Sequence, residues 1–226
     1  IAADALNAEF EVILQTLSFG KAKPLAVAQP MPSLIALKQI GLAMHNHHAA
    51  YRSLPGNIVS EDGKPLLSWR VAILPFIEQL PLYQQFHLDE PWDSEHNIQL
   101  VDKMPPLYGH PVLKIKPNTT VYQRPRGEEM IMNYDKGMSF RSITDGTAMT
   151  ILAVEALPTE AVAWTKPMDL NVDMNKPTAG MVDDTRAGFN VLMAHGAVKF
   201  ISNNVDPDLL KALLTRNGAE AIDGQF

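Results

Sequence analysis

The sequence predicts an α+β fold in which an early helix packs on a later antiparallel sheet, with a hairpin and a short helix at the C-terminal end. The first observation is one amphipathic segment, Leu34–Tyr51. The second is the apolar alternation that begins after Thr119 and is typical of strands. Helical patterns precede strand patterns, an order that favours α+β over alternating α/β.

The Leu34–Tyr51 segment is predicted to be a helix with one buried face. Its apolar residues recur at helical spacing: Leu34, Leu37, Ile40, Gly41, Met44 and Ala49. Pro55-Gly56 follows and ends the helix.

The region before this helix is expected to lie outside the main domain. Ala2–Leu17 has helical spacing, and Lys21–Pro32 contains three prolines among small residues. We therefore expect a helical arm or the tail of an upstream domain at 1–20, a linker at 21–32 and the α+β domain at 33–226. The chain begins with Ile1 rather than Met, so we expect it to be part of a longer protein.

Between the helix and the strands, short helices are expected. Pro75 and Pro81 interrupt the apolar stretch Leu66–Gln85, because proline breaks helices. Asp93-Ser94 can cap a short helix that runs to Lys103.

Strands are predicted where β-branched and aromatic residues alternate between turn signals: Thr119–Gln123, Glu129–Tyr134, Met149–Glu155 and Ala161–Trp164. The clearest hairpin joins Phe189–Ala194 to Ala197–Ser202 through His195-Gly196. Its alternation predicts strands buried on one face, with Phe200 among the inward residues. Asp206-Pro207 then starts a helix that Asn217-Gly218 ends.

Composition excludes several classes of function. The 226 residues carry a net charge of −6 and no basic run, so we expect no nucleic-acid partner. The absence of cysteine excludes thiol catalysis and cysteine-based zinc sites. No apolar run reaches the length of a transmembrane segment. Serines lack a nucleophile-elbow context, and no phosphate-binding glycine loop is present.

Several blocks occur together in one order along the chain: Leu37–Asn46 with His48, Leu54-Pro55, Ser68–Arg70, Leu74–Gln79, Leu82-Tyr83, Phe86–Ser94, Ile143–Thr147, Trp164–Pro167, Phe200-Ile201 and Leu213–Gly218. Through these blocks the region from Leu34 to Ile222 resembles a large bacterial family of unknown function, expanded in planctomycetes, whose members often look like type IV prepilins.

The resemblance implies a pilin-like, secreted or surface-exposed domain without an established enzyme activity. Prepilin-like members carry an apolar helix with a processing site directly before the first block, where this chain has Lys21–Pro32. A secreted member outside filaments is therefore the better fit. Many relatives also place a histidine nine residues before an Asp-Gly turn, and here those places hold Thr185 and His195-Gly196.

His45 and His48 are candidate metal ligands, because residues three apart share a helical face. A zinc site needs a third ligand, for which His87, His96 and Glu78 are candidates. The alternative is structural: the two imidazoles hydrogen-bond loop carbonyls or the Trp69-Arg70 segment and orient the end of the helix.

Four carboxylates lie within seven residues, at Asp89, Glu90, Asp93 and Glu95. Such oxygens suit calcium, although the spacing of a calcium loop is missing. Alternatively, Asp93 caps a helix and Trp92 packs. The acids from Asp169 to Asp173, and Asp183-Asp184, are expected to be solvated loop residues.

Three hypotheses follow. The first is a non-enzymatic, extracytoplasmic structural or interaction protein that presents Phe86–His96 and Trp164–Val172 to a surface protein or glycan. The second is a solute- or carbohydrate-binding module that uses Trp92, Trp164 and Asp93, although a tryptophan ending a strand is more often packed. The third is a metal-dependent hydrolase built on His45 and His48.

Overall fold

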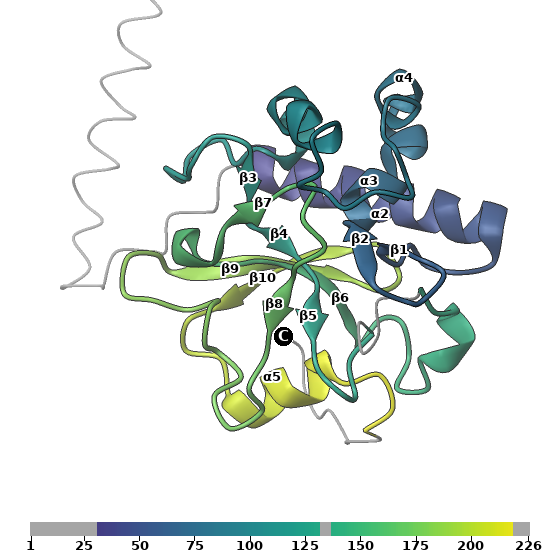
Figure 1. The fold of residues 1–226 in the computed structure, drawn as a ribbon. Coiled ribbons are helices and arrows are strands. Elements are labelled where there is room, and N and C mark those ends of the chain that lie inside the picture. The colour runs from purple at the N-terminus through teal and green to yellow at the C-terminus, as the bar shows by residue number, and fades with distance from the viewer. Residues whose placement is uncertain (1–30, 132–136, 219–226) are drawn as a thin grey trace, which may run out of the picture.

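A four-stranded antiparallel sheet lies between two helices, and the fold is α+β. The computed structural model describes residues 31–131 and 137–218. Helix α2 (Met31–Tyr51) runs along one face of the sheet, and helix α5 (Pro207–Leu214) lies against the other (Figure 1). Each face of the sheet therefore has its own core.

The central sheet has the strand order β10-β9-β6-β4. Its strands are β4 (Tyr122–Gln123), β6 (Ile151–Glu155), β9 (Gly188–Met193) and β10 (Val198–Ser202). Three two-stranded sheets surround it: β1 (Ile58–Val59) with β2 (Pro65–Leu67), β3 (Thr119–Thr120) with β7 (Val162–Ala163), and β5 (Pro125–Arg126) with β8 (Leu170–Asn171). The β5–β8 pair is parallel and the others are antiparallel.

The predicted C-terminal hairpin is present. Strands β9 and β10 pair with Val198 opposite Leu192 and Ser202 opposite Gly188. Gly196 has φ +98°, a left-handed conformation that side chains rarely adopt. Glycine at this position therefore allows the tight turn.

The expectation that this hairpin is buried on one face only was wrong for β9. All six β9 residues are buried, because α5 packs on one side of the strand and α2 on the other. Phe189 and Val191 belong to the α5 core, whereas Leu192 belongs to the α2 core. Phe200, expected to point inward, is 39% exposed on the edge strand β10.

Helix α2 buries the face that its spacing predicts. Leu37, Ile40 and Met44 are fully buried in the core that α2 shares with β9, although Ala49 is exposed. Gly41 lies at the closest approach: a Cβ added there would be 2.7 Å from Leu192 Cδ1. The missing side chain therefore sets the distance between helix and sheet.

We expect Gly41→Val to destabilise the fold by about 2 kcal/mol, because a branched side chain would collide with Leu192 in a packed core. Urea unfolding measures this change, and Ala49→Val on the exposed side of the same helix is the control. Equal unfolding midpoints for the two variants would contradict the close packing.

The segment after α2 forms short helices, as its prolines predict. They are α3 (Trp69–Ala72), η1 (Leu74–Ile77), α4 (Leu80–Tyr83), η2 (Asn97–Lys103) and η3 (Pro106–Tyr108), with η4 (Phe140–Ser142) and η5 (Pro158–Glu160) later in the chain. Ser68 caps α3 by accepting a hydrogen bond from the Arg70 amide. Most of these helices cover α2 on its side away from the sheet (Figure 1).

Two sequence-based boundaries differ from the structure. Glu129–Ile131 forms turns rather than the start of the predicted strand, whose remainder lies outside the described residues. Helix α2 begins at Met31, two residues before the expected start of the domain at 33. The expected arm at 1–20, and the linker up to residue 30, lie outside the described residues.

The structure contains no membrane-spanning candidate in its described ranges: each helix there is too short or too polar to cross a bilayer.

Candidate functional site

The end of α2 holds the histidines singled out as metal candidates. His45 Nε2 hydrogen-bonds the Ala194 carbonyl at 2.9 Å, and the His45 and His48 rings pack on Phe140 with centroids 4.7 and 4.5 Å away. Burial lowers the pKa of His48, and His45 and Arg52 lower it further. The hydrogen bond of His45 confirms the structural alternative for that residue, because it connects the end of α2 to the C-terminal hairpin.

A third ligand for these histidines is absent from residues 31–131 and 137–218. That part of the chain contains no group of three or more histidine, aspartate or glutamate side chains placed to hold a metal. His87 and His96 instead stack on each other, with ring centroids 3.6 Å apart and planes 1° apart. The zinc site and the calcium site both stay sequence-based predictions.

The acidic loop Phe86–His96 is held by one buried side chain that sequence reasoning missed. Asn97 is fully buried, and its Nδ2 donates to the His87 carbonyl at 2.9 Å and to the Pro91 carbonyl at 3.1 Å. Its Oδ1 accepts the His87 amide at 3.0 Å. A carboxamide can replace missing backbone pairing in this way, so the loop has a fixed path.

The carboxylates of this loop point mainly to solvent. Asp89 and Asp93 are exposed. Glu90 accepts from His87 Nδ1 at 2.9 Å, and hydrogen bonds from Ser94 first, then from His87, lower the pKa of Glu90. Asp93 is not the helix cap that the sequence suggested, because η2 begins at Asn97 with His96 at the N-cap position. Ser94 Oγ accepts the Asn97 amide at 3.1 Å.

The two candidate tryptophans differ in exposure. Trp164 is fully buried, stacks on Tyr108 and donates from Nε1 to the Val101 carbonyl at 2.8 Å. The alternative interpretation, that Trp164 packs in the core, is therefore confirmed, and its side chain offers no surface to a ligand. Trp92 is half-buried, and the Lys166 ammonium lies 5.6 Å from its ring centroid. This cation–π contact joins the Phe86–His96 loop to the Trp164–Val172 loop.

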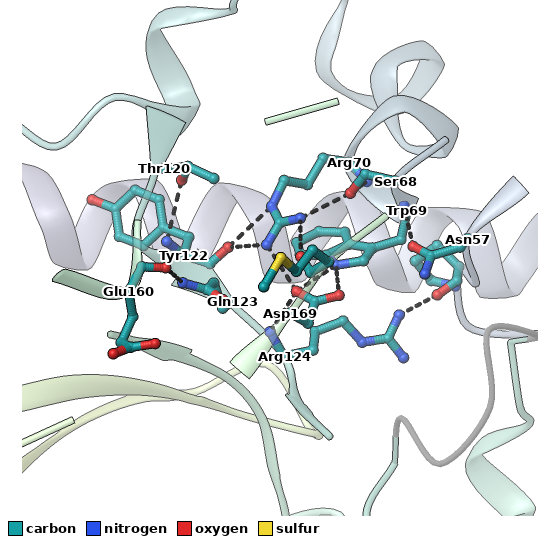
Figure 2. A network of polar contacts seen from close by, with 12 residues as sticks. Asn57, Ser68, Trp69, Arg70, Thr120, Tyr122, Gln123, Arg124, Glu160 and Asp169 are labelled. Carbon is teal, nitrogen blue, oxygen red and sulfur yellow. Dashed lines mark hydrogen bonds and ion pairs between the residues drawn. The ribbon is translucent and has the colours of Figure 1, made fainter. Parts of the chain in front are cut away.

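Asp169, expected to be a solvated loop acid, is instead the centre of a buried network (Figure 2). Its carboxylate lies 2.8 Å from Arg70 Nη2 and accepts from Trp69 Nε1 at 3.1 and 3.0 Å. The Arg124 amide also donates to it, at 3.0 Å. One carboxylate thus fastens α3, the β4–β5 connection and the start of β8 to one another.

The other donors of Arg70 are also used. Nε and Nη2 donate to the Tyr122 carbonyl at 3.1 and 2.8 Å, and Nη1 donates to Ser68 Oγ at 2.8 Å. The Arg70 carbonyl in turn accepts the Tyr108 hydroxyl at 2.8 Å. A fully buried guanidinium is tolerated here because its charge and its donors have partners.

Arg124 is fully buried with fewer partners. Its Nη1 donates to the Pro55 carbonyl, whereas Nε and Nη2 have no hydrogen-bond partner among the residues that the structure describes. Burial lowers the pKa of Arg124 and Asp169 opposes that shift, but a guanidinium stays protonated at neutral pH. Two buried cations therefore share the one carboxylate of Asp169.

A second buried cluster surrounds Glu155 on β6. Its carboxylate accepts from Ser33 Oγ at 2.5 Å and Asn190 Nδ2 at 2.9 Å, and it pairs with Arg186 Nη1 at 3.0 Å. Ser33 stands in the first turn of α2 and Asn190 on β9. The cluster therefore anchors the start of α2 to the sheet.

His110 faces the same carboxylate in a fixed tautomer. Its Nδ1 accepts the amides of Val112 and Leu113, at 3.2 and 2.9 Å, so Nε2 carries the proton of the neutral ring. Nε2 lies 3.5 Å from Glu155 Oε1. Nε2 therefore presents its proton to the Glu155 carboxylate across a long contact.

An open cleft lies at the end of α2 and borders the Asp169 network through Asn57. It has a volume of about 450 Å³ and is called the α2-end cleft below. Its lining residues are His47, Tyr51, Ser53, Leu54, Gly56, Asn57, Ile58, Ala72, Pro75, Tyr83 and Gly137. His47 donates from Nδ1 to the Ser53 carbonyl at 2.8 Å, which leaves Nε2 as its acceptor.

Comparison with known proteins relates only the first part of the described chain to a family. No curated protein matches the sequence. No solved structure matches it either. Residues 31–112 match the sequence model of SBP_bac_10, described as protein of unknown function (DUF1559). This region includes α2, the turn that follows it and the short helices up to η3. Over that region the chain is similar to a family of unknown function.

Proposed function

We propose that this chain is a non-enzymatic interaction protein with a pilin-like arrangement of helix on sheet, which acts outside the cytoplasm and binds a surface protein. The observation that carries this proposal is a face built from two joined loops, of which Phe86–His96 carries the exposed acids. We call it the acidic face and define it as Phe86–His96 together with Trp164–Val172.

The acidic face suits recognition because its path is fixed before any partner binds. Asn97 holds the first loop through three backbone groups, and the Trp92 amide donates to the Leu66 carbonyl at 2.8 Å. Asp169 anchors the second loop in the core. A preformed surface loses less conformational entropy on binding.

The charge of the face indicates the chemistry of its partner. Asp89, Glu90, Asp93 and Glu95 lie in one loop, and Asp89, Asp93 and Glu95 are exposed. Complementary charge accelerates encounter and selects partners. We therefore propose a partner protein that presents lysine or arginine residues.

A non-enzymatic role is favoured by the way the histidines are used. His45, His47 and His96 each hydrogen-bond a backbone carbonyl, with distances of 2.9, 2.8 and 2.8 Å. These contacts fix helix and loop geometry, and they occupy one nitrogen of each ring. The imidazoles thus serve as structural hydrogen-bond donors.

Site-specific photo-crosslinking of the full-length protein in its source cells tests this proposal. A photoreactive residue at Asp89 is expected to give one defined adduct in an extracytoplasmic fraction, and Glu95→Lys is expected to remove most of it. The matched control places the same group at Glu61, which is exposed on the β1–β2 hairpin. Identical adducts from both positions, no adduct, or a cytoplasmic location would contradict the proposal.

A further inference from the structure

We propose that the α2-end cleft binds an acidic sugar, whose ring lies against Tyr51 and Tyr83 and whose carboxylate faces the turn in front of Arg124. The proposal is independent of the acidic face. It rests on the aromatic and polar groups that line the cleft and on the unmatched buried charge behind the lining.

One wall of the cleft is aromatic. Tyr51 is 65% exposed, and its ring lies 4.7 Å from the His47 ring and 6.1 Å from the Phe76 ring. Tyr83 is half-buried and also lines the cleft. These contacts hold the Tyr51 ring in place while leaving most of its surface open. An exposed ring of this kind suits the apolar face of a sugar.

Other groups that line the cleft are polar. The turn Ser53–Asn57 contributes backbone groups, and the His47 Nε2 lone pair is available as an acceptor at the same cleft. The Asn57 carboxamide is fixed by accepting the Trp69 amide at 2.9 Å. A sugar has an apolar face and a hydroxyl-bearing edge, and the aromatic and polar groups of the cleft match both.

Charge favours an acidic sugar over a neutral one. The Arg124 guanidinium donates to the Pro55 carbonyl, and Pro55 lies between two residues that line the cleft. Figure 2 shows this guanidinium below Asn57, at the side of the network away from Asp169. Because Arg70 and Arg124 share one carboxylate, one positive charge is unmatched in a low-dielectric interior, where its field is weakly screened.

The other hollows of the described surface differ from one another in charge. The cleft of about 490 Å³ beside the stacked histidines is lined by Lys103 and by no acidic side chain, and the groove of about 350 Å³ along α2 is lined by Glu78. A hollow of about 300 Å³ between β10 and α5 has a mostly apolar lining. The described lining of the α2-end cleft contains no acidic side chain. The α2-end cleft combines an exposed tyrosine ring with a buried arginine behind its lining, and the cleft that contains Lys103 is the rival site for an anion.

Calorimetric titration of the whole chain with D-glucuronate and D-glucose tests the proposal, because the two probes differ only in the carboxylate. We expect glucuronate to bind with one site per chain and at least tenfold more tightly than glucose. Tyr51→Ala is expected to weaken glucuronate binding about tenfold, whereas His87→Ala in the other cleft leaves it unchanged. Equal affinity for both sugars, or no saturable binding of either, would overturn the proposal.

The role of Arg124 is tested by a measurement on the wild type, because variants of a buried arginine can fail to fold. In the wild type, glucuronate is expected to shift the NMR signals of the Arg124 Nε–H group and the Gly56 amide, and glucose is not. Arg124→Lys keeps the charge and is expected to retain the preference for glucuronate. Binding of glucuronate that leaves the Arg124 signal unchanged, or that shifts the His87 and His96 signals instead, would overturn the assignment.

Discussion

Asp169→Asn is expected to lower the free energy of unfolding by about 3–5 kcal/mol, the largest effect of any single change considered for this chain. The Asp169 carboxylate is the counter-charge for two fully buried guanidinium groups, Arg70 and Arg124. An asparagine would keep the shape of the side chain while leaving both cations without an anion. Removing one partner of a buried pair costs more than the pair contributes, because the remaining charge stays desolvated.

Urea unfolding followed by tryptophan fluorescence measures this loss, since Trp69 donates directly to Asp169. Asp184→Asn is the matched control, because Asp184 is an exposed acid on a loop. A change below 1 kcal/mol for Asp169→Asn would show that the network does not hold the fold as described.

Glu155→Gln is expected to cost about 3 kcal/mol at pH 7. The groups around this carboxylate are donors: Ser33 Oγ, Asn190 Nδ2 and Arg186 Nη1. A glutamine amide would direct its own N–H groups at some of these donors and would leave them unsatisfied in a buried site. Equilibrium unfolding measures the loss, with Glu160→Gln at an exposed position as the control.

The same residue predicts a pH dependence of stability. Burial is the largest influence and raises the pKa of Glu155, but hydrogen bonds from His110, Ser33 and Asn190 together outweigh it, so the pKa is lowered from its ordinary value of 4.5. A lowered folded-state pKa gives a contribution that is present above pH 4.5 and is lost as the pH falls through the folded-state value. We expect the unfolding midpoint of the wild type to fall more steeply below pH 4.5 than that of Glu155→Gln. Parallel curves would contradict this.

The elements that sequence predicted best are those whose signals are local. Helix α2 follows from the spacing of Leu37, Ile40 and Met44, and the C-terminal hairpin follows from alternation around Gly196. Helix α5 follows from the Asp206 cap and the proline after it. In each case the residues that specify the element are neighbours along the chain.

The sequence-based predictions were wrong or incomplete where segments far apart in the sequence determine the structure. Strand β5 pairs with β8 more than forty residues later, and nothing local marks Pro125-Arg126 as a strand. Strand β9 is buried on both faces because α5 returns to cover it, a tertiary effect that alternation in one strand does not encode. Short apolar runs are ambiguous for this reason.

The buried charges were the least predictable part of the candidate sites. Asp169 looked like one of several loop acids, yet its burial depends on Arg70, 99 residues away. Glu155 ends the apolar run Ile151–Val154, which was the one available signal that a carboxylate would be buried there. Pairing partners this distant cannot be identified from one sequence.

The acidic face exists as a fixed surface before any partner binds. Amide hydrogen exchange on the wild type tests it most directly, because His87 and Trp92 donate their amides to Asn97 Oδ1 and the Leu66 carbonyl. We expect both amides to exchange at least a hundredfold more slowly than an unstructured peptide. Exchange of both at the unstructured rate would show that the face is not preformed and would contradict the account.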